Sequence, residues 1–78
     1  MSRTLASLRP GERGVVAGFP HVDSFAQRLM QLGFLEGTTV TVLRQAPTGD
    51  PIEVELMGYA LSLRLEEARA IPLEPPAA

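Results

Sequence analysis

The 78-residue sequence contains no cysteine, no lysine and no tryptophan. Without cysteine it has no disulfide framework, no thiolate zinc site and no cysteine nucleophile, and it suits a reducing compartment. Without lysine, its seven basic residues are all arginines, and nine acidic residues outnumber them, for a net charge of -2. This balance lacks the basic field that supplies most non-specific affinity for nucleic acid, so we expect no nucleic-acid partner.

Long hydrophobic runs are also missing. No stretch approaches the roughly 18 apolar residues of a membrane span, and the N-terminus lacks the pattern of a signal peptide. We therefore expect a cytoplasmic protein without direct membrane insertion. Hydrophobic residues nevertheless make up 45% of the chain, which is enough for one core and one domain. The sequence predicts a single domain over 1–78, with an ordered core at about 5–73 and a mobile tail at 74–78.

One short helix is expected, and it begins at Ser24 and ends at Gly33. Gln27 follows Ser24 by three residues, which is the spacing of a capping box. The hydrophobic residues of this segment fall on one arc of about 160° on a 100° helical wheel; they are Phe25, Ala26, Leu29, Met30 and Leu32. Gly33 suits the left-handed position after a helix end, where Phe34 would pack back on Leu29.

Strands are expected on both sides of this helix. The segments that show turn-bounded or alternating apolar patterns are Gly14–Phe19, Thr38–Arg44, Ile52–Leu56, Ala60–Leu65 and Ala70–Leu73. Residues 66–68 can add one helical turn. Five short strands and one helix favour a small barrel, since closure removes exposed sheet edges. The predicted fold class is a mainly β, SH3-like five-stranded β-barrel with one short embedded α-helix.

The hairpin after Pro51 allows a register to be predicted. Gly58 and Tyr59 can form a two-residue type II′ turn, because such a turn requires glycine at its first central position. This turn pairs Met57 with Ala60, and the pairs that follow are Leu56 with Leu61, Val54 with Leu63, Ile52 with Leu65 and Glu53 with Arg64. The apolar side chains then share one face. In this register Leu43 lies on the outer face beside Glu53.

Catalytic and metal-binding groups are scarce. His21 is the single histidine, so one base would have to serve Ser7, Ser24 or Ser62, and no acid is placed to orient it. The carboxylate pairs at Glu53/Glu55 and Glu66/Glu67 suit a solvated strand face and a helical first turn. His21 and Asp23 are weak candidates for a metal site, because two ligands do not complete one. We expect no enzymatic activity, no catalytic residue and no cofactor.

Three segments carry a resemblance to a known family. They are Leu29–Val42 (LMQLGFLEGTTVTV), Ala46–Ile52 (APTGDPI) and Gly58–Arg64 (GYALSLR). In order and spacing they resemble the FeoA family, the ferrous iron transport protein A domains, from about Leu5 to Leu73. The resemblance implies an SH3-like barrel and a small cytosolic accessory protein of bacterial ferrous iron uptake. It also implies a partner, the membrane permease FeoB, which carries a cytosolic GTPase domain.

The hypothesis drawn from this resemblance is that the edge of the helix and the turn after it bind and modulate the FeoB GTPase-permease through its cytosolic region. The proposed contact residues are Arg28, Leu29, Met30, Phe34 and Leu35. The chain itself would be a monomer or a weak homo-oligomer.

A different class of function stays open beside it. The chain could be a metal-responsive sensor or chaperone related to the C-terminal domain of metal-dependent repressors. His21, Asp23 and carboxylates of a second copy would then bind a transition metal between chains.

Overall fold

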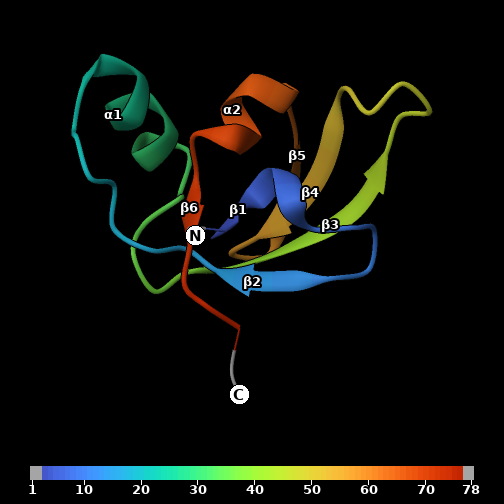
Figure 1. Cartoon of the computed structure of the whole chain (residues 1–78), viewed down its shortest axis with the longest axis horizontal. Helices are drawn as coiled ribbons and strands as arrows, with labels where there is room; N and C mark the ends of the chain where they lie inside the picture. Colours follow the sequence, from blue (N-terminus) through green and yellow to red (C-terminus); the bar gives the residue numbers. More distant parts are fainter. Residues whose placement is uncertain (1–2, 77–78) are drawn as a thin grey trace.

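The computed structural model describes residues 3–76 as six strands, two α-helices and one 3-10 turn (Figure 1). The strands are β1 (Arg3–Thr4), β2 (Arg13–Val15), β3 (Thr39–Gln45), β4 (Ile52–Leu56), β5 (Tyr59–Leu63) and β6 (Pro72–Leu73). The helices are the 3-10 turn η1 (Leu5–Ser7), α1 (Ser24–Gln31) and α2 (Leu65–Arg69). The fold is mainly β, as predicted. However, α2 is a second helix of five residues, where the sequence indicates only one turn.

The strands form two sheets. β2, β3, β4 and β5 make a four-stranded antiparallel sheet in that order, and β1 pairs with β6 in a two-stranded one. An isolated bridge between Val16 and Leu73 joins the two sheets on the β2 side. No strand within residues 3–76 closes the β5 side, because the chain leaves β5 through α2 before it reaches β6 (Figure 1). The predicted closed five-stranded barrel is therefore wrong.

The β4–β5 hairpin exists, but its register differs from the predicted one by two residues. Leu56 pairs with Tyr59, Val54 with Leu61 and Ile52 with Leu63. The turn consists of Met57 and Gly58, whose φ angles of 50° and 83° are both positive. Positive φ at both central residues is the requirement of a type I′ turn rather than type II′. A shift of two residues keeps every side chain on its face, so the apolar pattern fits both registers.

The shift also changes the partner of Glu53. The predicted pair with Arg64 is wrong: Glu53 lies opposite Ser62 on β5 and forms an ion pair with Arg44 on β3. The β3–β4 register shifts between Val42 and Arg44. Leu43 falls at this irregularity and is 38% exposed, so Arg44 takes the place beside Glu53 that the sequence assigns to Leu43.

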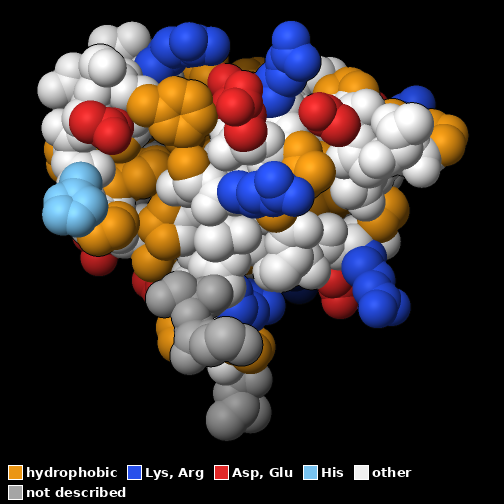
Figure 2. Space-filling model, turned by 45° about the horizontal axis from the view of Figure 1, so that its top comes forward, with side chains coloured by type: hydrophobic (Ala, Val, Ile, Leu, Met, Phe, Trp, Pro, Cys, Tyr) orange, Lys and Arg blue, Asp and Glu red, His pale blue; other side chains and the backbone are white. Residues whose placement is uncertain are grey.

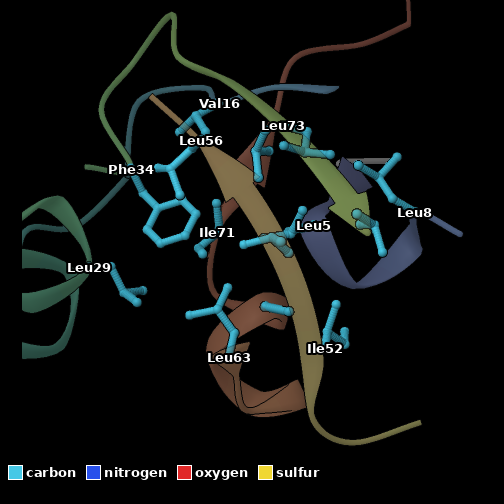
Figure 3. Close-up of a cluster of buried hydrophobic side chains, with 14 residues drawn as sticks. Leu5, Leu8, Val16, Leu29, Phe34, Ile52, Leu56, Leu63, Ile71 and Leu73 are labelled. Atoms are coloured by element: carbon cyan, nitrogen blue, oxygen red, sulfur yellow. The ribbon is translucent and has the colours of Figure 1, made fainter. Parts of the chain in front are cut away.

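The core lies between the four-stranded sheet, the helices and the β1–β6 pair (Figure 3). Its largest fully buried side chains are Phe34, Leu5, Leu29, Ile52, Leu56, Leu63, Ile71, Val16, Val40, Val42 and Val54. Figure 3 shows Phe34 pointing into this cluster, with Leu29 of α1 near it at the same end. Each such side chain contributes about 1.5–3 kcal/mol by leaving water. Nearly the whole length of the chain supplies them, as expected for so short a domain.

The two ends of the described chain lie together. The Glu74 N–H donates to the Val15 carbonyl (2.8 Å), and the Arg3 guanidinium donates to the Glu74 carbonyl (3.1 Å). The predicted mobile tail at 74–78 therefore begins with a hydrogen-bonded residue, and residues 77–78 lie outside the described residues. None of the helices within residues 3–76 has the length and hydropathy that a membrane crossing demands.

Candidate functional site

Helix α1 and the turn after it form the candidate site, and the sequence explains their geometry. The C-terminal end follows the predicted motif: the Phe34 N–H donates to the Leu29 carbonyl (3.2 Å) and the Gly33 N–H to the Met30 carbonyl (3.0 Å). Gly33 has a φ of 114°. These are the two hydrogen bonds of a Schellman motif, with glycine where the backbone needs a positive φ. The turn therefore holds the residues after α1 in a fixed path.

The N-terminal end corrects one prediction. The Asp23 carboxylate accepts a hydrogen bond from the Ala26 N–H (2.8 Å) and is the N-cap, so the capping box predicted at Ser24 is wrong. Helix α1 still begins at Ser24. Asp and Ser are about equally good N-cap residues, so the sequence Asp23-Ser24 does not decide which of the two caps the helix. The path of the preceding loop decides it.

The five proposed contact residues separate into two groups. Leu29 is 1% exposed and Phe34 is 0% exposed. Both belong to the core and cannot offer surface to a partner without unfolding this end of the molecule. Arg28 and Leu35 are exposed, and Met30 is half-buried. The accessible part of the predicted surface is therefore Arg28, Met30 and Leu35.

Arg28 also has a role within the fold. Its guanidinium lies 3.5 Å from the Glu67 carboxylate of α2. The other carboxylate oxygen of Glu67 accepts a hydrogen bond from the Arg64 N–H (2.8 Å) at the start of α2. The Glu67 side chain is 12% exposed and that of Arg28 is 70% exposed. Arg28 therefore links the two helices while most of its side chain stays in solvent.

A hollow of about 220 Å³ lies beside α1. Its lining residues are Gly18, Phe19, Val22, Met30, Phe34 and Glu36. Met30 forms part of its wall, and the one acidic group, Glu36, extends toward Gly18, where an added Cβ would meet its Oε1 at 3.1 Å. The hollow is thus mostly apolar with a single carboxylate.

Two further apolar side chains at this end are exposed, and the sequence analysis missed both as surface residues. Val22 is 57% exposed and Phe25, which the helical wheel assigns to the core, is 37% exposed. Val22 precedes the N-cap, and a hydrophobic residue there normally packs on the fourth helical residue. That residue is Gln27, which is polar and exposed. The mismatch becomes visible only once Asp23 is known to be the N-cap, because the sequence predicts the cap at Ser24.

We call Val22, Phe25, Met30 and Leu35, with Arg28, the α1-end surface. Figure 2 shows hydrophobic side chains gathered between charged ones over the part of the molecule that carries α1. Val22 and Met30 lie together at the hollow, and exposed apolar groups rimmed by charge are typical of interaction sites.

The β4–β5 turn lies against the C-terminal end of α1. The Tyr59 hydroxyl donates a hydrogen bond to the Leu32 carbonyl. A Cβ added at Gly33 would lie 3.2 Å from Leu56 Cδ1 and 3.4 Å from Met57 Sδ. Glycine is therefore needed at this contact for its lack of a side chain as well as for its φ.

The weak metal candidates do not form a complete site within one copy. His21 and Asp23 are both exposed, and one Asp23 oxygen already caps α1. No group of three or more His, Cys, Asp or Glu side chains comes together in the part of the chain that the structure describes.

Comparison with known proteins identifies the family. The model of the FeoA domain family matches residues 3–75. A fusion of Fe(2+) transport protein A with the Fe(2+) transporter FeoB from Porphyromonas gingivalis is 36% identical over 70 residues, which are 90% of this chain. The chain spans 8% of the length of that fusion protein.

Solved structures agree with this match. A FeoA-like protein of Clostridium acetobutylicum is 33% identical, with a TM-score of 0.85 over 94% of this chain and 85% of that one. FeoA of Stenotrophomonas maltophilia in complex with zinc is 29% identical, with a TM-score of 0.75 over 92% and 89%. It is described as an SH3 domain protein.

A manganese-dependent transcriptional repressor shares the fold alone, at 24% identity and a TM-score of 0.80 over 92% of this chain and 36% of that one. The predicted family is confirmed: this chain belongs to the FeoA domain family of ferrous iron transport.

Proposed function

We propose that this chain is a cytosolic accessory protein of ferrous iron uptake that binds and modulates a FeoB-type membrane GTPase-permease. The observation that carries the proposal is the P. gingivalis relative, in which one polypeptide joins the two activities. Two domains fused in one protein have a high effective concentration for each other. A domain of this family that is not fused to the permease needs a surface that binds it instead.

The α1-end surface is the proposed binding surface. A standard interface takes about 800 Å² from each partner, which would be about a sixth of the 5095 Å² accessible surface of this chain. A smaller patch suits the few apolar residues present. Each apolar side chain that becomes buried contributes about 1.5–3 kcal/mol. Two or three of them with a rim arginine reach about micromolar affinity after the cost of association.

The test is a binding measurement between this chain and the cytosolic region of the cognate permease. Leu35→Asp places a charge at a residue that is 45% exposed, so the fold tolerates it, and Met30→Asp places one at the hollow. We expect each to weaken binding about ten-fold or more, which corresponds to about 1.4 kcal/mol. Leu43→Asp is the matched control, because Leu43 is an equally apolar, exposed residue on β3. It should bind like the unmodified chain.

The outcomes separate the surface from the function. If the unmodified chain binds and all three variants bind equally well, the α1-end surface is wrong but the partner stands. If the unmodified chain does not bind the cytosolic region and alters neither GTP hydrolysis nor iron uptake by the permease, the proposed function is wrong. Circular dichroism spectra of the variants show whether each one is folded.

The zinc complex of the S. maltophilia relative favours a second candidate, a metal-responsive domain that binds its ion between chains. His21 is exposed and could supply one ligand from each copy. Calorimetry with Zn²⁺ or Fe²⁺ distinguishes the candidates. Heat of binding together with a larger oligomer, both lost in His21→Ala, would support the second. If neither metal gives a heat of binding or changes the size of the oligomer, the second candidate is wrong.

A further inference from the structure

Strand β5 is a bare edge of the four-stranded sheet. It lies last in the order β2-β3-β4-β5. Leu56 and Tyr59 flank a two-residue turn, and the two residues that flank such a turn form a hydrogen-bonded pair. Along an antiparallel strand, hydrogen-bonded and non-hydrogen-bonded pairs then alternate. Tyr59, Leu61 and Leu63 therefore bond to β4. The N–H and C=O groups of Ala60 and Ser62 point away from it.

These outward groups lack a partner within residues 3–76. No backbone or side-chain hydrogen bond of the described chain reaches the main-chain groups of Ala60 or Ser62. Both residues are exposed. The strand sequence, YALSL, also has none of the usual protection of a sheet edge, since it contains no charge and no proline and pairs with β4 without a bulge. The edge is therefore open to another strand.

We propose that a second copy of this chain occupies this edge, with the two β5 strands antiparallel about a two-fold axis at Leu61. The register follows from the outward groups. With Leu61 opposite Leu61 of the second copy, Ala60 of each copy lies opposite Ser62 of the other. A hydrogen-bonded pair exchanges two N–H to C=O bonds. The two such pairs then satisfy all four N–H and C=O groups that Ala60 and Ser62 leave free on each copy.

The charges beside the edge fit this arrangement. Glu55 lies opposite Ala60 on β4 and is exposed. Arg64 follows β5 with extended backbone angles (φ -70°, ψ 150°) and is also exposed. Glu55 and Arg64 are on opposite sides of the axis, so the two-fold places Arg64 of one copy diagonally across from Glu55 of the other. Only the small residues Gly58 and Ala60 lie between them, which leaves room for the arginine side chain.

The two-fold also brings an exposed side chain close to the other copy. Met57 at the hairpin turn is 70% exposed. In the paired register it arrives beside the end of β5 of the second copy. Charge and hydrogen bonding therefore both favour a second copy over an unrelated strand.

Single cysteines test the register directly, because the chain has none of its own. The Cα atoms of a non-hydrogen-bonded antiparallel pair are about 4.5 Å apart, within the range that a disulfide spans. Leu61→Cys should therefore cross-link two copies under mild oxidation. Ala60→Cys is the matched control: two Ala60 positions are offset by two residues and lie about 8 Å apart, which is too far to bridge. We expect cross-linking at Leu61 to be at least about ten-fold faster.

A second variant tests the association without cysteine. Ser62→Pro removes an N–H that points away from β4, and edge strands tolerate proline at such positions. Light scattering and analytical ultracentrifugation, with a chelator present, should show the unmodified chain associating as its concentration rises and Ser62→Pro remaining a monomer.

Equal cross-linking of both cysteine variants would overturn the proposal. So would an unmodified chain that stays monomeric to millimolar concentration, or a folded Ser62→Pro that associates as before. The proposal does not depend on the permease.

Discussion

The two edges of the four-stranded sheet differ in whether other segments of the chain cover them. The β2 edge is covered: Val16 bridges to Leu73, and the Ala17 N–H donates to the Pro72 carbonyl (2.8 Å). The β5 edge has no such cover among residues 3–76. The segments that cover β2 are the two ends of the described chain, paired as β1 and β6. Within residues 3–76, the β2 edge is therefore covered and the β5 edge is open to intermolecular contact.

The largest effect is expected at the covered edge. Leu73 is 4% exposed, and Leu73→Ala removes its side chain from between the two sheets. We expect a loss of about 2–5 kcal/mol in the free energy of unfolding, the usual cost of such a core truncation. Urea unfolding measures it. Leu43→Ala, at an exposed position, should cost less than about 0.5 kcal/mol. Equal costs for the two variants would mean that β6 does not protect the β2 edge.

A smaller loss is expected where α1 supports the start of the bare edge. Gly33→Ala should cost about 1–3 kcal/mol, because its positive φ disfavours any side chain and its Cβ would crowd the hairpin. Gly37→Ala is the control: Gly37 also has a positive φ, of 90°, but nothing lies within 4 Å of an added Cβ. The difference between the two losses isolates the contact with Leu56 and Met57. No difference would indicate that the hairpin does not press on α1.

The helix cap should give a loss of about 1 kcal/mol. Asp23→Ala removes the carboxylate that accepts from the Ala26 N–H, and N-cap truncations typically cost this much. Ser24→Ala serves as its control, since Ser24 lies one residue inside the helix, and should change stability by less than about 0.5 kcal/mol. Thermal unfolding of both variants measures the contrast. A larger loss for Ser24→Ala would restore the capping box that the sequence predicts.

The smallest effect is expected at the bare edge itself. Ser62→Thr keeps a hydroxyl on an exposed strand position and adds a methyl group that strands accommodate well. Measured at low concentration, where the chain is a monomer, its stability should stay within about 0.5 kcal/mol of the unmodified chain. A loss as large as that of Leu73→Ala would show that the β5 edge is packed against other residues.

The strands of the hairpin could be predicted from the sequence, but their register could not. Alternation has a period of two, so a shift of two residues leaves every apolar side chain on the inner face. The choice depends on the turn, and Met57 adopts a positive φ of 50° that is uncommon for a residue with a side chain. Glycine alone at Gly58 indicated a turn without deciding whether it was the first or the second central residue.

The candidate site also has one part that could be predicted from the sequence and one part that could not. The Schellman motif after α1 could be predicted because it depends on residues next to one another, from Leu29 to Phe34. The exposure of Phe25 could not, because the apolar arc of a helical wheel is wider than the part that the rest of the domain covers. Leu29 and Phe34 were proposed as contacts although the Schellman motif predicts that they pack on each other, and the structure buries both.

The sequence by itself therefore determined the mainly β class, the place of α1, the strands of the hairpin and the family, because each depends on local patterns or on an ordered set of motifs. The tertiary structure decided which edge of the sheet is covered, which register the hairpin takes and which apolar residues of α1 remain exposed. These depend on contacts between residues far apart in the chain, such as Val16 with Leu73 and Tyr59 with Leu32, and no local pattern encodes them.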